Sequence, residues 1–372
     1  MRPVPLADYT TLGLGGPALA FLEPAAEADL VSAVRSADER GEPVLVLGGG
    51  SNVVVADEGF PGTVIRVATR GVTITQDGAA AGPVTVTAAA GEDWDALVAR
   101  CAGEGLAGLE CLSGIPGLAG ATPIQNVGAY GQEVADTITT VRAYDRQRRE
   151  VAEIPAAACG FAYRASTFKR TPFAPARGAG AAATATGRFV VLDVTFRLSR
   201  GALSGPVRYP ELATTLGVAP GERVPLSEAR SAVLKLRARK GMVLDAGDPD
   251  TRSAGSFFTN PVVPAAGFAA VEDRARRACG PDTQVPHFPA GDGDVKIPAA
   301  WLIEHAGFGK GYRGQNAAAG ARISSKHTLA LVNPGAATTA SLLALARQIR
   351  DGVRATFGVT LAIEPVLVAV AA

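Results

Sequence analysis

The chain has 372 residues, of which 47% are apolar, so it is long enough for two or three domains with sizeable cores. Its 36 basic and 35 acidic residues nearly cancel, which leaves no electrostatic footprint for nucleic acid or an anionic membrane surface. Four cysteines and three histidines lack metal-ligand spacing, which argues against structural zinc and a disulfide framework and favours a reducing cytoplasm. The apolar run 359–372 is short and contains Glu364 and Pro365, so it predicts a buried strand and not a membrane span.

The first half of the chain mixes helical and strand patterns. Residues 27–41 place Leu30, Val31 and Val34 on one face and end at a glycine, which predicts a helix, and residues 93–106 repeat this helical spacing. Runs rich in β-branched residues predict strands at 43–49, 62–68, 84–90, 140–146 and 189–199.

The second half begins after a weakly patterned stretch. Residues 174–187, "APARGAGAAATATG", are almost all small and uncharged, which predicts a mobile surface loop. Turn-rich sequence at 200–225 predicts a boundary. A second unit follows, with helices predicted at 227–241, 299–307 and 340–358. Because helices and strands alternate irregularly, the predicted fold class is α+β.

Two glycine-rich segments are candidates for binding a cofactor. "VLVLGGGSNVVV" (44–55) places three glycines after a buried strand, where consecutive N–H groups can form an anion-binding nest; a plain hairpin turn is the alternative. "LSGIPGLAGATPIQNVGAYGQEV" (112–134) is a long loop with almost no charge, which is usually functional in a compact domain; an ordered Ω-loop without a ligand is the alternative. The early "GLGGPA" lacks the strand and helix that a dinucleotide-binding fingerprint requires.

Five motifs occur in a specific order: "LGGGSN", "SGIPGLAGATPIQNVGAYGQE", "YRASTFK", "AGSFFTNP" and "KHTLALVN". Together they resemble the UDP-N-acetylenolpyruvoylglucosamine reductase family of bacterial peptidoglycan synthesis, over about residues 10–370. The resemblance implies an FAD-binding region of the vanillyl-alcohol-oxidase (PCMH) type at 1–200, in subdomains of about 1–68 and 69–200. An α+β substrate-binding domain at 201–356 and a segment at 357–372 that returns to the FAD half would complete the fold.

The activity implied by the resemblance is reduction of the enolpyruvyl ether of UDP-N-acetylglucosamine to UDP-N-acetylmuramate. NADPH would be the hydride donor and FAD a noncovalent cofactor, in a cytoplasmic, monomeric enzyme without a metal. The two glycine-rich segments would hold FAD through Gly48, Gly49, Gly50, Ser51, Asn52, Gly114, Ile115, Pro116, Gly117, Gly120, Ala121, Pro123, Gln125, Asn126, Gly128, Ala129 and Tyr130.

The resemblance assigns catalytic roles to Arg164, Ser256 and Glu364. A guanidinium at Arg164 suits a carboxylate or enolate charge, with a surface salt bridge as the alternative. The carboxyl of Glu364 lies in an apolar run, where it is costly unless it is paired or protonated, and a protonated form could hydrogen-bond an enolate. The hydroxyl of Ser256, in "GSFFTNP", is a weak acid that suffices for an enolate carbon if it is well positioned; a turn residue is the alternative.

Substrate contacts are assigned to Tyr209, Arg237, Lys240, Asn260 and His327. A solvated basic helix face and a structural histidine are the ordinary alternatives for Arg237, Lys240 and His327. Two other functions remain open: a different flavin oxidase of the same fold, and a nucleotide-sugar-binding module without catalysis, which predicts a colourless protein. A serine hydrolase has little support, because the three histidines show no triad spacing.

Overall fold

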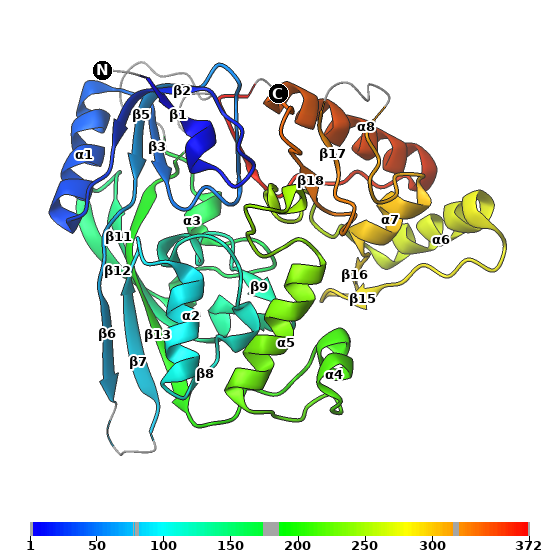
Figure 1. Cartoon of the computed structure of the whole chain (residues 1–372), viewed down its shortest axis with the longest axis horizontal. Coiled ribbons are helices and arrows are strands. Elements are labelled where there is room, and N and C mark those ends of the chain that lie inside the picture. The colour runs from blue at the N-terminus through cyan, green and yellow to red at the C-terminus, as the bar shows by residue number, and fades with distance from the viewer. Residues whose placement is uncertain (1–2, 77, 79–81, 174–185, 315–319, 371–372) are drawn as a thin grey trace.

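The computed structural model of the chain describes residues 3–76, 78, 82–173, 186–314 and 320–370. The loop predicted at 174–187 lies outside these residues except for its last two positions. Figure 1 shows two sheets in the N-terminal half and a mainly helical C-terminal unit on the opposite side. Within the described ranges, no helix combines the length and apolarity that crossing a membrane requires.

The first sheet has the strand order β1-β2-β5-β3. Its strands are β1 (Val4–Pro5), β2 (Pro17–Leu22), β3 (Val44–Leu47) and β5 (Phe60–Arg66). Both β2 and β3 pair in parallel with β5, and helix α1 (Glu27–Arg40) connects β2 to β3. The predicted helix at 27–41 is thus confirmed: it buries Leu30 and Val34 and ends at Gly41, whose φ of 68° suits glycine.

The second sheet is antiparallel, with the order β12-β11-β13-β7-β6 and a short strand β8 beside the end of β13. Its strands are β6 (Val72–Gln76), β7 (Val84–Ala89), β8 (Leu106–Ala107), β11 (Ile138–Asp145), β12 (Glu150–Pro155) and β13 (Phe189–Arg200). Helix α2 (Trp94–Gly103) starts at Asp93, whose side chain accepts the Ala96 N–H, and it buries Trp94 completely. All five predicted strands and the helix at 93–106 are confirmed.

Helices α4 (Pro210–Leu216) and α5 (Leu226–Arg239) follow β13 and share a small apolar cluster. The chain does not separate cleanly at the predicted boundary, because α5 packs against α2 of the preceding half; the two helices lie side by side in Figure 1. The helix predicted at 227–241 is confirmed as α5, whereas α4 was not predicted.

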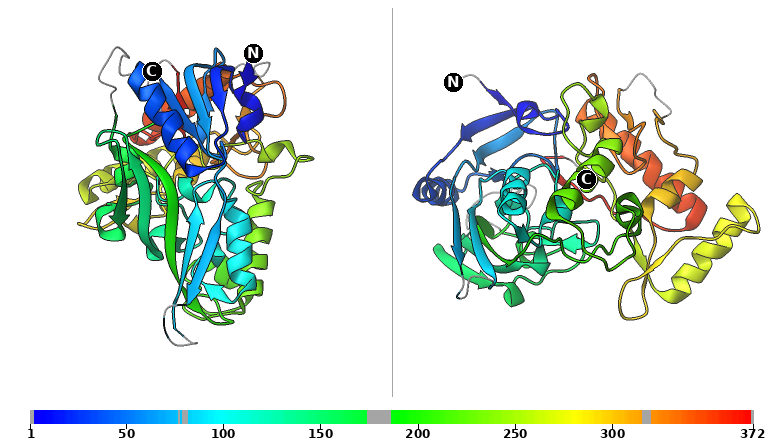
Figure 2. Two further views of the ribbon diagram at one scale, coloured as in Figure 1. Left: turned by 90° about the vertical axis from the view of Figure 1, so that its left-hand side faces the viewer. Right: turned by 60° about the horizontal axis from the view of Figure 1, so that its bottom comes forward.

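The C-terminal unit is built on three helices, α6 (Ala265–Cys279), α7 (Ala299–His305) and α8 (Thr339–Phe357). Short strands accompany them: β14 (Val262–Val263), β15 (Phe288–Pro289), β16 (Val295–Lys296), β17 (Arg322–Ile323) and β18 (Leu331–Val332). The predicted helices α7 and α8 are confirmed, and α6 was missed. Figure 2 shows these helices gathered on one side of the molecule, away from the first sheet.

The chain finally returns to the N-terminal half. Strand β19 (Val366–Val368) pairs in parallel with β4 (Val53–Val55), the strand that follows the three glycines. A second link joins Asp57 to the start of α8, because its two carboxylate oxygens accept the N–H groups of Thr339 (2.8 Å) and Ala340 (2.9 Å). These are the first N–H groups of α8, which have no partner within the helix.

We expect Asp57→Ala to lower stability by about 1–2 kcal/mol, because it removes two hydrogen bonds and a favourable charge at a helix N-terminus. Asp57→Asn, which keeps an acceptor, should lose less, and the exposed neighbour provides a control in Glu58→Ala. Urea titrations followed by circular dichroism measure the effect. A midpoint for Asp57→Ala equal to that of Glu58→Ala would show that this link does not stabilise the chain.

Candidate active site

A cavity of about 530 Å³ lies among the glycine-rich loops, α5 and the C-terminal unit. Its wall contains the three predicted catalytic residues, Arg164, Ser256 and Glu364. It also contains the predicted substrate residues Tyr209, Arg237, Lys240 and His327. The predicted cofactor residues in the wall are Gly48, Gly49, Gly50, Ser51, Asn52, Ile115, Pro116, Gly117, Ala121, Gln125, Gly128, Ala129 and Tyr130.

Five residues assigned to ligands in the sequence lie outside the cavity wall. Gly120 and Pro123 are buried, and a side chain at Gly120 would collide with Ala90. The side chain of Asn126 is occupied within the protein, donating to Glu133 (2.6 Å) and accepting from Ala135.

The other two have packing partners of their own. Gly114, with a φ of 70°, donates its N–H to Asp95 and packs on Leu234. The side-chain oxygen of Asn260 accepts the Ala299 N–H (2.9 Å) at the start of α7. Their predicted ligand contacts therefore stay untested predictions.

The two glycine-rich segments meet backbone to backbone. A Cβ atom on Gly49 would lie 2.7 Å from the Cα of Gly117, so no other residue fits here without a shift. The Ser51 hydroxyl donates to the Pro116 carbonyl (2.9 Å), and Asn52 donates to Gln125 Oε1 (2.7 Å). The two loops thus form one apolar, glycine-lined wall that a flat ring system can approach closely, which fits FAD.

Arg237 supplies a buried positive charge at this wall. One guanidinium nitrogen donates to the Met242 carbonyl (2.8 Å), but its Nε is buried without a hydrogen-bond partner. Burial lowers the pKa of Arg237 to about 10, with a smaller opposing effect from Tyr130 and Asp95. A buried, incompletely paired cation is costly, and an anionic ligand such as a diphosphate would offset that cost.

Backbone pairing brings Ser256 and Glu364 to the same place. The Glu364 N–H donates to the Phe257 carbonyl (2.9 Å), and the Thr259 N–H donates to the Ala362 carbonyl (3.0 Å). The rings of Phe257 and Phe258 are completely buried in the core of the C-terminal unit. The two phenylalanines therefore anchor the segment, and the serine that precedes them is left in the cavity wall.

Arg164 faces Glu364 from the other half of the molecule. Its backbone φ is 53°, an unusual value for a non-glycine residue, and such strain is often found at functional sites. Its guanidinium donates to the carbonyls of Asn126 (3.4 Å) and Gly128 (3.0 Å). Arg164 Nε lies 3.1 Å from Glu364 Oε1 as an ion pair, but it lacks the alignment of a hydrogen bond.

The environment of Glu364 favours its protonated form. Burial raises the pKa of the Glu364 carboxyl, and the positive charges of Arg164 and Lys169 offset only part of that effect. Gln125 donates to Glu364 Oε1 at 3.4 Å. Lys169 belongs to "YRASTFK" and lies in the cavity wall, although no role was predicted for it.

The predicted substrate residues Tyr209 and Lys240 lie in the cavity wall beside Tyr130. The rings of Tyr209 and Tyr130 meet edge to face, with centroids 5.4 Å apart, and the Lys240 ammonium lies 5.8 Å from the Tyr130 ring centre. Glu211 forms an ion pair with Lys240 at 2.6 Å. An anionic substrate that binds Lys240 must compete with this carboxylate.

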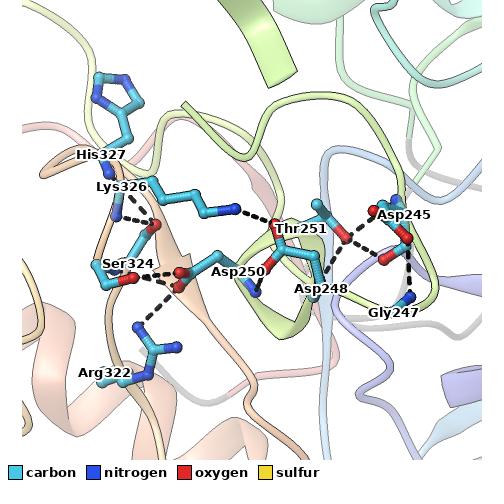
Figure 3. A network of polar contacts seen from close by, with 10 residues as sticks. Asp245, Gly247, Asp248, Asp250, Thr251, Arg322, Ser324, Lys326 and His327 are labelled. Carbon is cyan, nitrogen blue, oxygen red and sulfur yellow. Dashed lines mark hydrogen bonds and ion pairs between the residues drawn. The ribbon is translucent and has the colours of Figure 1, made fainter. Parts of the chain in front are cut away.

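His327 follows directly on a network of ion pairs and hydrogen bonds that joins two loops (Figure 3). Asp250 forms an ion pair with Arg322 (2.7 Å) and accepts hydrogen bonds from Ser325, while Lys326 pairs with Asp248 (2.5 Å). The His327 ring points away from this network in Figure 3 and lies in the cavity wall. Burial, with help from Lys240 and Lys310, lowers the pKa of His327 to about 4, so the ring is neutral near neutral pH.

Within the described part of the chain, no group of three or more His, Cys, Asp or Glu side chains is arranged to hold a metal ion.

Comparison with known proteins identifies a known domain in each half of the chain. Residues 18–150 match the model of an FAD-binding domain, and residues 248–368 match that of the UDP-N-acetylenolpyruvoylglucosamine reductase C-terminal domain. The chain is 54% identical over 369 residues to the UDP-N-acetylenolpyruvoylglucosamine reductase of Thermobifida fusca, covering 99% of this chain and 98% of that one. The reductase of Streptomyces avermitilis is 53% identical, with 100% and 95% covered.

A solved structure shows the same fold. The UDP-N-acetylenolpyruvylglucosamine reductase of Thermus caldophilus superposes with a TM-score of 0.60 at 26% identity, over 99% of this chain and 98% of that one. The predicted α+β architecture with a PCMH-type FAD-binding region is therefore confirmed.

The raised pKa of Glu364 predicts a pH dependence of stability. A carboxyl whose pKa is raised by folding holds its proton more tightly in the folded state. The wild-type protein therefore loses stability as the pH rises from the usual pKa of a glutamate toward the raised pKa of Glu364. Glu364→Gln carries no such proton, so the thermal midpoint of the variant relative to wild type should increase between about pH 5 and about pH 8.

The matched control for this measurement is Glu58→Gln, which changes an exposed carboxyl. Its midpoint relative to wild type should stay constant over the same range. A constant or decreasing difference for Glu364→Gln would mean that Glu364 is ionised in the folded protein at ordinary pH.

Proposed function

The chain belongs to the UDP-N-acetylenolpyruvoylglucosamine reductase family, and on this premise we propose that it reduces UDP-N-acetyl-3-O-(1-carboxyvinyl)-glucosamine to UDP-N-acetylmuramate with NADPH as the hydride donor. It is an FAD-dependent oxidoreductase of peptidoglycan precursor synthesis. The observation that carries the specific reaction is the meeting of Arg164, Ser256 and Glu364 in the wall of one cavity, beside the glycine-rich loops.

The reaction places two requirements on the protein. Reduction of the terminal carbon of the enolpyruvyl double bond needs a hydride, which FAD would supply when it is bound and has been reduced by NADPH. Negative charge then develops on the adjacent carbon and its carboxylate, so the site has to stabilise this charge and deliver one proton to that carbon.

Each requirement has a candidate group in the cavity wall. The Arg164 guanidinium and a protonated Glu364 carboxyl supply the positive charge and the hydrogen bond for the enolate. The Ser256 hydroxyl supplies the proton, and its position is fixed by the buried Phe257 and Phe258. The UDP part of the substrate carries a diphosphate. Arg237 and Lys240 are two cations of the cavity wall that suit this group.

In this proposal, FAD binds noncovalently to the glycine-rich wall described above. The alternative of a nucleotide-sugar-binding protein without catalysis does not account for a buried carboxyl with a raised pKa next to an arginine with strained backbone. Such a pair is typical of a catalytic site.

Anaerobic stopped-flow absorbance tests the function in two half-reactions. With the wild-type holoenzyme, NADPH should bleach the flavin, and the enolpyruvyl substrate should restore its colour. If Ser256 is the proton donor, Ser256→Ala should keep the first rate close to wild type and lose most of the second. Ser256→Cys, a stronger acid of similar reach, should recover part of it.

Three results would argue against these assignments. A wild-type protein whose reduced flavin is not reoxidised by the enolpyruvyl substrate does not have the proposed activity. Equal slowing of both half-reactions in Ser256→Ala would mean that the serine shapes the flavin site. An unchanged second half-reaction would mean that another group delivers the proton.

Arg164→Lys should be far more damaging than a conserved charge suggests. Lysine cannot reproduce a planar group that contacts two backbone carbonyls and Glu364 together. Loss of one preorganised donor costs about 3 kcal/mol in the barrier, or about two decades in turnover. Steady-state turnover measures the effect, with Arg170→Lys on the neighbouring helix as the control, and a near-normal rate would exclude Arg164 from stabilising the enolate.

A further inference from the structure

Lys169 lies in the cavity wall without a role in the proposed reaction. It belongs to helix α3 (Thr167–Arg170), which is capped by Ser166. The Ser166 hydroxyl accepts the Lys169 N–H (3.3 Å) and donates to the Ile124 carbonyl (2.5 Å). Because Ile124 directly precedes Gln125, this cap fixes the distance between Lys169 and Gln125.

Lys169 and Asn52 together determine which way the Gln125 amide faces. Gln125 Oε1 accepts from Asn52 Nδ2 (2.7 Å) and from Lys169 Nζ (3.4 Å). A rotated amide would place its own N–H groups against these two donors. The amide nitrogen is therefore directed at Glu364 Oε1, which it reaches at 3.4 Å.

Both polar neighbours of the Glu364 carboxyl face the same oxygen. Gln125 Nε2 and Arg164 Nε (3.1 Å) approach Oε1. Oε1 accepts the Gln125 N–H and lies beside the positive charge of Arg164, so it is the poorer place for a proton, and the neutral form of Glu364 carries its proton on Oε2.

We propose that Lys169 is a positioning residue for Glu364: by fixing the Gln125 amide it makes Glu364 Oε1 an acceptor and Oε2 the proton-bearing oxygen that serves the enolate. The inference rests on the proposed function for its role in catalysis. Its geometric part, the chain of contacts from Lys169 through Gln125 to Glu364, does not depend on the substrate.

The charge of Lys169 acts on Glu364 as well. The charged and titratable groups that face this carboxyl are Arg164 and Lys169, with Tyr163 nearby; Ser256, from the paired segment, carries no charge. A neighbouring cation favours the carboxylate, so removal of Lys169 moves the pKa of Glu364 further upward. Since Glu364 acts in its protonated form, the alkaline limit of activity then moves to higher pH.

The test compares three holoenzyme variants with wild type. Lys169→Met keeps the length of the side chain but removes its charge and donor groups, and Lys169→Arg keeps both. Arg170→Met is the matched control, because Arg170 lies next to Lys169 on α3 and donates to the Gly160 carbonyl, outside the cavity wall. Flavin bleaching by NADPH and reoxidation by the enolpyruvyl substrate are measured separately as functions of pH.

Lys169→Met should slow reoxidation about tenfold, because the proton on Glu364 is no longer held in one place. Bleaching by NADPH should stay within about twofold of wild type, since that step uses no proton from Glu364. The alkaline limit of reoxidation should move upward by about half to one pH unit. Lys169→Arg and Arg170→Met should resemble wild type in all three measurements.

Infrared difference spectra give a readout that is independent of turnover. The protonated carboxyl band that disappears in Glu364→Gln identifies Glu364, and its titration midpoint should be higher in Lys169→Met than in wild type. An unchanged midpoint would overturn the inference even if the wild-type enzyme failed to use the substrate. So would equal slowing of both half-reactions, or the same behaviour in Lys169→Met and Arg170→Met, because both indicate a purely structural lysine.

Discussion

The hydrogen bond from the Glu364 N–H to the Phe257 carbonyl is the contact on which the geometry of the cavity depends. It joins two segments that are far apart in the sequence, one with the serine and one with the carboxyl, and both residues lie in the wall of the same cavity. Two completely buried phenylalanine rings hold one partner, and the pairing of β19 with β4 holds the other. A shift of either segment by one residue would turn the alternate side chains toward the cavity.

Exclusion of water shifts the pKa values of the charged groups of the cavity. Burial lowers the pKa values of Arg237 and His327 and raises that of Glu364, in each case because the charged form is poorly solvated. Hydrogen bonds and charges are stronger in such surroundings than in water. The same surroundings make each unpaired group costly, and the buried Nε of Arg237 is one such cost that a bound anion would relieve.

Local sequence determined more of the fold than of the site. The periodic spacing in 27–41 and 93–106 was sufficient to predict α1 and α2, and both glycine-rich segments were candidates for cofactor binding, whereas their meeting in one wall is seen only in the structure. Helix α6 was missed because only Phe268, Val271 and Ala275 mark its buried face among alanines and arginines. Sequence periodicity also carries no information on long-range packing. The contact between α5 and α2 was therefore not predicted.

Within the site, sequence patterns located residues but not their partners. Asn126 and Asn260 are polar and lie in recognised motifs, yet backbone and side-chain groups of the protein occupy them. Lys169, in contrast, was not predicted as a site residue, although it is the last residue of "YRASTFK". Its proposed role follows from the structure, where its ammonium lies 3.4 Å from Gln125 Oε1. Such contacts come from tertiary packing between loops, which has no periodic signal.

The parallel pairing of β4 with β19 also sets an order of assembly during synthesis. β4 leaves the ribosome early, but its partner strand is translated after both sheets and after α6, α7 and α8. Until then the edge of β4 has unpaired backbone groups next to the glycine-rich wall, and an open strand edge of this kind invites pairing with other chains. The segment that brings Glu364 also brings Val368, which is completely buried in the core around β4, so this core is completed only when the acid arrives and folding and the onset of activity are coupled.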